Sequence, residues 1–78
     1  MKSLDEFCQL VAEQFENTPS SSISPSTEFK KIDEYRSLVA LSIVAMIDEE
    51  FDVQLRSDDM RSASTVEDLY NKVKSYCE

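Results

Sequence analysis

The sequence predicts an all-α protein, a small four-helix bundle with three main helices and one short helix. Three observations support this prediction. The 78 residues contain no glycine, both prolines fall in one segment, and apolar residues recur at helical spacing on either side of that segment. Because a chain of this length forms one small domain, we place a single domain at residues 1–78.

The first apolar repeat predicts a helix from Leu4 to Phe15 or Glu16. Ser3 and Glu6 at its start have the spacing of a capping box, in which each side chain accepts a hydrogen bond from the backbone N–H of the other residue. The apolar residues lie three and four positions apart, as on one face of an amphipathic helix: Leu4, Phe7, Cys8, Val11 and Phe15.

The segment NTPSSSISPSTEF cannot continue a helix because it holds both prolines and a run of serines. It predicts a long loop. Ile23 and Phe29 give this loop two apolar side chains that can tether it to the core, so we expect it to be ordered. The following FKKIDEYR has apolar residues at Phe29, Ile32 and Tyr35 and is consistent with one turn of helix.

The most apolar segment, SLVALSIVAMIDEEF, predicts a helix that begins at Ser37. Its first ten or so residues are apolar on nearly all sides, so part of this surface packs inward and part is available to a partner. Its end is acidic, and acids there interact unfavourably with the helix dipole. This cost suggests a use for the acids in binding, although a merely solvated acidic face is also consistent with the pattern. The acids are Asp48, Glu49, Glu50 and Asp52.

Two further helices follow. Ser57, followed by two aspartates, has the pattern of an N-cap and predicts a short helix over SDDMR. Thr65 and Asp68 approximate a second capping box. The apolar repeat after them predicts a final helix from Val66 to Tyr76.

The composition argues against an enzyme. The absence of histidine removes the usual general base and the commonest metal ligand, and the absence of glycine excludes phosphate-binding loops and the turn of an EF-hand. Carboxylates are plentiful, but no pattern distinguishes an acid and base pair from surface charge. We therefore predict no catalytic residue and no metal site.

The net charge of −8 disfavours nucleic acid and anionic membranes as partners and favours a basic protein surface, although it is also consistent with a role in solubility alone. Asp5 and Glu6 lie where a signal peptide would need an uninterrupted apolar stretch, and no apolar segment has the length of a membrane span. We expect a cytoplasmic monomer. Cys8 and Cys77 have apolar neighbours at helical spacing and are predicted to be ordinary buried thiols.

Ser37 lies where a polar, charged segment meets the apolar helix. Two interpretations are open. Its side chain can act as the N-cap of the helix. Alternatively, its hydroxyl can carry a phosphate ester, which the positive end of the helix and Arg36 would stabilise.

The order of elements resembles that of an acyl carrier protein over nearly the whole chain. The central signature of that family is Asp-Ser-Leu, followed by a helix with an acidic, phenylalanine-containing end. The matching residues here are Arg36-Ser37-Leu38 and Ile47-Asp48-Glu49-Glu50-Phe51-Asp52. Phe29 lies eight residues before the serine, where the family commonly has phenylalanine, and Thr65-Val66-Glu67-Asp68-Leu69 resembles the start of its last helix.

This resemblance implies that a phosphopantetheinyl transferase attaches 4′-phosphopantetheine from coenzyme A to Ser37. The thiol of the arm would hold an acyl or aminoacyl group as a thioester and present it to acyl-loading and acyl-transfer enzymes with basic patches. The resemblance also implies roles for the neighbouring residues. An apolar stripe for partners would consist of Leu38, Leu41 and Ala45. Basic residues of partners would meet Asp48 and Glu49. The residues that belong mainly to the core would be Ile43, Val44, Ile47 and Phe51.

Three departures from the family pattern favour a specialised, free-standing carrier, dedicated to a pathway such as polysaccharide, polyketide or peptide assembly. Arg36 replaces the aspartate before the serine, Val39 and Ser42 stand where fatty-acid carriers tend to have acids, and Asp33-Glu34 replaces a Leu-Gly pair. The alternative is an acidic helical adaptor that is never modified.

Overall fold

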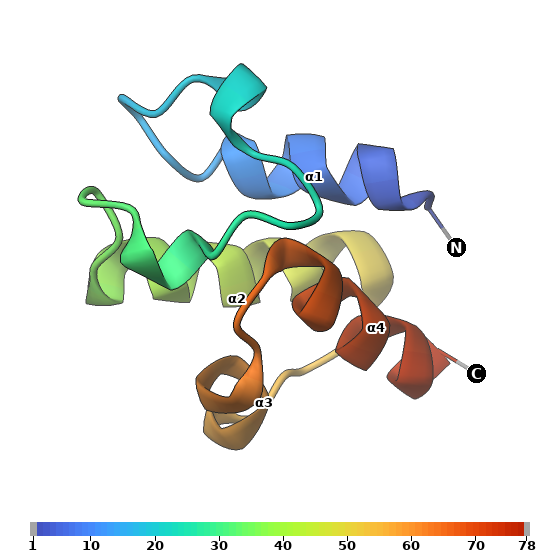
Figure 1. Ribbon diagram of the computed structural model, residues 1–78. Helices are drawn as coiled ribbons and strands as arrows, with labels where there is room; N and C mark the ends of the chain where they lie inside the picture. The colour runs from blue at the N-terminus through green and yellow to red at the C-terminus, as the bar shows by residue number, and fades with distance from the viewer. Residues whose placement is uncertain (1, 78) are drawn as a thin grey trace.

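The computed structural model describes residues 2–77, which form four α-helices and contain no β-strand. Two single turns of 3-10 helix, Ser20–Ser22 and Phe29–Lys31, lie in the connection after the first helix. The predicted all-α bundle with three main helices and one short helix is therefore confirmed (Figure 1). The helices are α1 (Leu4–Ala12), α2 (Ser37–Phe51), α3 (Ser57–Ser62) and α4 (Val66–Cys77).

Three of the helices enclose the core. α1, α2 and α4 pack on one another pairwise, whereas α3 packs against α4. Figure 1 shows α1 and α2 running in opposite directions, with α3 on the side of α2 away from α1. No helix within residues 2–77 has both the length and the apolar character needed to cross a membrane. The largest fully buried side chains are Phe7, Phe29, Ile43, Ile47 and Leu69.

α1 begins as predicted but ends earlier. The Ser3 hydroxyl accepts a hydrogen bond from the Glu6 N–H (3.2 Å) and the Glu6 carboxylate accepts one from the Ser3 N–H (3.0 Å), so the capping box is confirmed. The helix ends at Ala12 rather than at Phe15, because the next residues form tighter bonds three residues apart. This turn still buries Phe15, so Phe15 continues the apolar repeat although it lies beyond the helix. For that reason the repeat predicted a helix that was too long.

The long connection is ordered by both its apolar and its polar groups. Ile23 and Phe29 are buried in the core, as predicted, and the expected helical turn is the 3-10 turn at Phe29–Lys31. The carbonyls of Thr27 and Pro25 accept hydrogen bonds from the Val66 N–H (3.0 Å) and the Glu67 N–H (2.9 Å). These two bonds use N–H groups of the first turn of α4, which have no partner within the helix.

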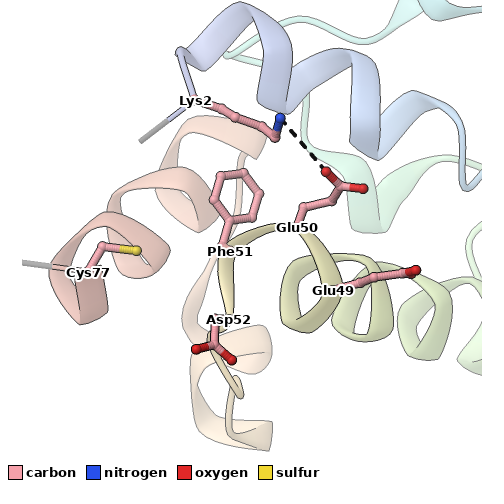
Figure 2. Close-up of a pocket in the computed structure, with 6 residues that line it drawn as sticks. All are labelled: Lys2, Glu49, Glu50, Phe51, Asp52 and Cys77. Carbon is pink, nitrogen blue, oxygen red and sulfur yellow. Dashed lines mark ion pairs between the residues drawn. The ribbon is translucent and has the colours of Figure 1, made fainter.

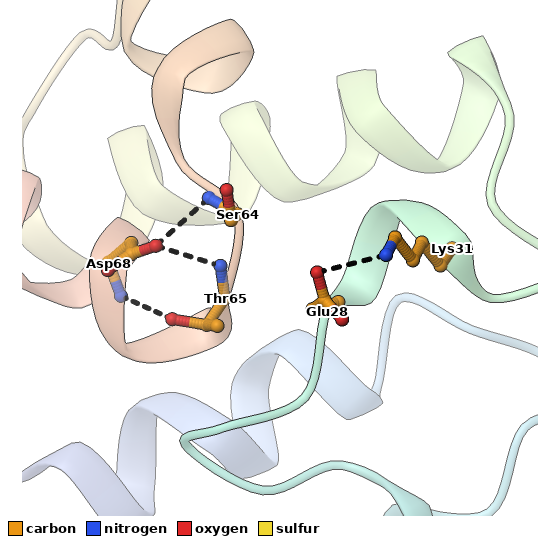
Figure 3. A network of polar contacts seen from close by, with 5 residues as sticks. All are labelled: Glu28, Lys31, Ser64, Thr65 and Asp68. Carbon is orange, nitrogen blue, oxygen red and sulfur yellow. Dashed lines mark hydrogen bonds and ion pairs between the residues drawn. The ribbon is translucent and has the colours of Figure 1, made fainter.

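Carboxylates three residues into the helix begin both α3 and α4. Asp68 accepts hydrogen bonds from the Ser64 and Thr65 N–H groups (both 3.1 Å), and the Thr65 hydroxyl accepts one from the Asp68 N–H, which confirms the second capping box (Figure 3). The prediction of Ser57 as an N-cap is wrong. Arg56 is the N-cap residue of α3, and its N–H donates to Asp59 Oδ2 at 3.0 Å.

The two cysteines differ in burial. Cys8 is buried among core residues, and its burial raises the pKa of its thiol. Cys77 is exposed, so the prediction of a buried thiol is wrong for this residue. It follows Val73 by one turn on the same side of α4, but Val73 is the last buried residue of the helix.

Candidate attachment site at the start of α2

Ser37 is the first residue of α2, and its side chain is exposed. Arg36, in extended conformation, occupies the N-cap position and makes no capping hydrogen bond with its side chain. The interpretation of Ser37 as an N-cap is therefore wrong, and its hydroxyl makes no hydrogen bond with the residues that the structure describes. Because the first turn of α2 contains no acid and its N–H groups lack a side-chain cap, this helix end favours a negatively charged group.

An exposed apolar stripe continues from Ser37 along α2. Leu38 and Leu41 are 70% and 66% exposed, and Ala45 is exposed as well. These residues are spaced by three and four positions, which places them on one side of the helix. The opposite side packs into the core through Val39, Ile43, Met46 and Ile47.

A groove of about 440 Å³ lies beside Ser37, between α2 and the segment that contains α3. Val44, predicted to belong mainly to the core, is half-buried and lines this groove, whereas Ile43 and Ile47 are fully buried as predicted. Phe51 is half-buried against the core. Apart from Ser37, the groove is lined from α2 by Ala40, Leu41 and Val44 and from the other side by Leu55, Arg56, Ser57 and Met60.

The segment before Ser37 is fixed by Glu34. Its carboxylate accepts hydrogen bonds from the N–H groups of Glu16 (2.6 Å) and Asn17 (3.0 Å) and from the Thr18 hydroxyl (2.8 Å). Partial burial raises the pKa of Glu34, but these hydrogen bonds outweigh it and leave the pKa below its ordinary value. The loop after α1 is thus joined to the residues that lead into α2.

Residues 5–73 match the protein family described as "Phosphopantetheine attachment site". The match covers most of the chain. This protein belongs to that family of phosphopantetheine carriers. No curated protein and no solved structure matches the chain.

Carriers of this family bear a covalently attached 4′-phosphopantetheine group. The residues at the start of α2 fit such a group. Ser37 has an exposed hydroxyl, the helix end favours a negatively charged group such as a phosphate, and the groove beside Ser37 has mainly apolar walls. When bound, the group supplies the thiol that forms the thioester with the cargo.

α3 has no fully buried side chain, and polar contacts add to the half-buried packing of Met60 against the core. Lys30 Nζ donates to the carbonyl oxygens of Met60 (3.0 Å) and Arg61 (2.8 Å) at the end of α3. The Tyr76 hydroxyl donates to Asp59 Oδ2 at 2.6 Å, which lowers the pKa of Asp59 and raises that of Tyr76. These contacts position one wall of the groove.

The far end of α2 is acidic. Asp48 and Glu49 are exposed, and Lys2 Nζ lies 3.8 Å from Glu50 Oε1. Figure 2 shows this ion pair, with Glu49 and Asp52 extending away from it. A hollow of about 740 Å³ lies here, at the opposite end of the helix from Ser37, and is lined by Lys2, Glu49, Glu50, Phe51, Asp52 and Cys77.

Sequence patterns predicted the position of Ser37 at the start of α2 and the exposed stripe, but not the other wall of the groove. Leu55 and Met60 are isolated apolar residues in a short polar segment, so no periodic pattern marked them. Lys30 was also missed, because its partners lie about thirty residues further along the chain. No local signal in the sequence predicts either feature.

Proposed function

We propose that Ser37 is the residue that carries the phosphopantetheine arm, and that the protein presents an acyl or aminoacyl group on this arm to the enzymes of a biosynthetic pathway. The observation that carries the proposal is the exposed Ser37 hydroxyl at the start of α2, in a chain that matches the attachment-site family over residues 5–73. Ser42, the other serine of α2, lies inside the helix and is half-buried.

The division of chemistry between this protein and its partners follows from its residues. The chain has no histidine to activate the hydroxyl, so a phosphopantetheinyl transferase performs the activation and transfers the group from coenzyme A. The Ser37 oxygen forms the new bond to the phosphorus of the phosphopantetheine group, the pyrophosphate bond of coenzyme A breaks, and adenosine 3′,5′-bisphosphate leaves while the transferase takes the hydroxyl proton. The groove shelters the arm between encounters with partner enzymes.

We propose that partners bind along α2. Leu38, Leu41 and Ala45 would contact apolar residues of the partner, and Asp48 and Glu49 would meet basic residues beyond them. The charge at Arg36 supports a specialised carrier, because an exposed cation stands beside the site at which partners approach the arm. The carrier would act as a free-standing cytoplasmic monomer.

The intact mass of the protein tests the attachment. After incubation of the purified chain with coenzyme A and a broad-specificity phosphopantetheinyl transferase, we expect a gain in mass of one phosphopantetheine group. Ser37→Ala should abolish the gain, whereas Ser42→Ala, the matched control on the same helix, should retain it. Failure of several transferases to modify the wild-type chain would overturn the proposal and leave an unmodified adaptor as the alternative.

A further inference from the structure

The three arginines of the chain differ in how their charges are used. Arg61 Nη1 lies 3.2 Å from Asp58 Oδ1 in an ion pair. Arg36 donates from Nε to the Glu34 carbonyl at 3.4 Å, and neither Arg36 nor Arg56 forms an ion pair with a carboxylate of residues 2–77. Two arginines thus form no ion pair within the described part of a chain that has twice as many acids as bases.

Both of these arginines are placed near Ser37, although the Arg36 side chain is turned toward Glu34 in this structure. Arg36 precedes it directly at the N-cap position of α2. Arg56 and Ser37 line the same groove from opposite sides. The carboxylate of Asp59, three residues after Arg56, already accepts hydrogen bonds from the Tyr76 hydroxyl and the Arg56 backbone N–H.

We propose that Arg36 and Arg56 form a clamp that binds the phosphodiester of the arm attached to Ser37. The inference rests on the proposed attachment at that residue. The phosphodiester is negatively charged and is joined directly to the Ser37 oxygen, so it lies at the edge of the groove that Arg56 lines, one residue after Arg36. Arginine suits this ligand because its planar fork of donors matches two phosphate oxygens at once.

The clamp determines where the arm begins. A phosphodiester held by Arg56 lies toward α3, so the rest of the arm starts along the apolar lining of the groove rather than in solvent. Because both arginines are exposed, each contact is weak and is screened by salt. The arm can therefore leave the groove when a partner enzyme binds.

The Nε–Hε resonances of the arginine side chains report the clamp directly. We expect the signals of Arg36 and Arg56 to move when ¹⁵N-labelled apo protein is converted to the modified form with coenzyme A and a transferase, while Arg61, paired with Asp58, stays in place. Intact mass verifies the conversion. A mass gain with an unmoved Arg56 signal overturns the clamp alone, whereas no mass gain overturns the attachment and the clamp together.

The ³¹P resonance of the attached phosphodiester gives a second readout from the side of the ligand. Arg56→Gln should shift this resonance and remove most of its dependence on NaCl, and Arg56→Lys, which keeps the charge without the fork, should give an intermediate shift. Arg61→Gln removes a cation from α3 itself, and the ³¹P resonance of this variant should equal that of the wild type. Identical resonances in Arg56→Gln and Arg61→Gln would overturn the inference.

Discussion

The two ends of α2 differ in charge, in exposed apolar surface and in the part of carrier function that we propose for each. The first end has Arg36 and Ser37, two exposed leucines and no acid in its first turn. The other end, about 22 Å away for fifteen residues at 1.5 Å each, is a cluster of acids. One helix therefore separates the proposed point of attachment from the acidic surface proposed for partners.

The helix dipole sharpens this difference. The positive end of α2 favours a phosphate at Ser37, so the proposed attachment agrees with the intrinsic field of the helix. At the negative end, the acids add to the field and destabilise the helix, and only Glu50 has an ion-pair partner, Lys2, among residues 2–77. The absence of acids at the first end leaves the helix dipole free to favour a phosphate. The acids at the second end destabilise the helix, which suggests that they serve a function in binding.

The largest change in stability should come from a substitution on the buried face of α2, compared with one on its exposed face. Ile43→Ala removes a fully buried side chain and should lower the free energy of unfolding by about 2–5 kcal/mol. Leu41→Ala, which alters a side chain that is 66% exposed, should change it by no more than about 0.5 kcal/mol yet lower the rate of acyl transfer to partner enzymes. Denaturant unfolding and transfer assays on both variants measure the two effects. Equal destabilisation by both substitutions would contradict the separation of the faces.

Reversal of the charge at the first end should change which transferase acts on the carrier. Arg36→Asp restores the acid that precedes the serine in the family signature, and it should raise kcat/KM for a fatty-acid-type transferase by about twofold to tenfold, as expected for a reversed exposed charge. Arg61→Asp makes the same change in net charge on α3 and should have little effect. An unchanged rate for Arg36→Asp would mean that Arg36 does not select partners.

Reversal of the charge at the second end should weaken partner binding in a salt-dependent way. Glu49→Lys should lower kcat/KM for transferase and acyl-transfer partners by about twofold to tenfold at low salt. The loss should shrink at high salt, because exposed charges are screened beyond about 3 Å at 1 M. Glu67→Lys, an exposed residue of α4, is the control with equal net charge. A loss that persists at high salt would contradict an electrostatic role for Glu49.

The smallest effect concerns the loop that leads into the first end. The pKa of Glu34 is lowered in the folded protein, so its contribution to stability is present above the ordinary carboxyl range and is lost as the pH falls through the folded pKa. Glu34→Gln should therefore be less stable than wild type at neutral pH, and the difference should disappear in acid. Denaturant unfolding across pH 7 to 3 measures this, with Glu13→Gln, an exposed residue, as control. A difference that stays constant with pH would show that the Glu34 charge is not responsible.

The features that sequence patterns predicted correctly are local. The capping boxes Ser3/Glu6 and Thr65/Asp68 depend on residues three apart, and the apolar repeats place α1 and α4 because their periodicity reflects one buried face. The position of Ser37 at the start of α2 follows from the same local pattern. The interpretation of Ser37 as the N-cap is wrong, because a residue pattern does not distinguish a capping residue from the first helical residue, which differs from it in backbone angles.

The features that were missed depend on contacts between distant segments. Glu34 holds the loop sixteen to eighteen residues before it, and Lys30 holds the end of α3 about thirty residues after it. Arg56 became a candidate only when the structure placed it across the groove from Ser37. A charged residue on a polar segment carries no signal that distinguishes such contacts from solvent exposure.

The most direct test of the central claim is to locate the modification within the chain. Trypsin cleaves after Arg36 and Arg56, so residues 37–56 form one peptide whose two serines are Ser37 and Ser42. In protein treated with coenzyme A and a transferase, fragmentation of this peptide should place one phosphopantetheine group on Ser37. A group on Ser42, or on a peptide from elsewhere in the chain, would contradict the account.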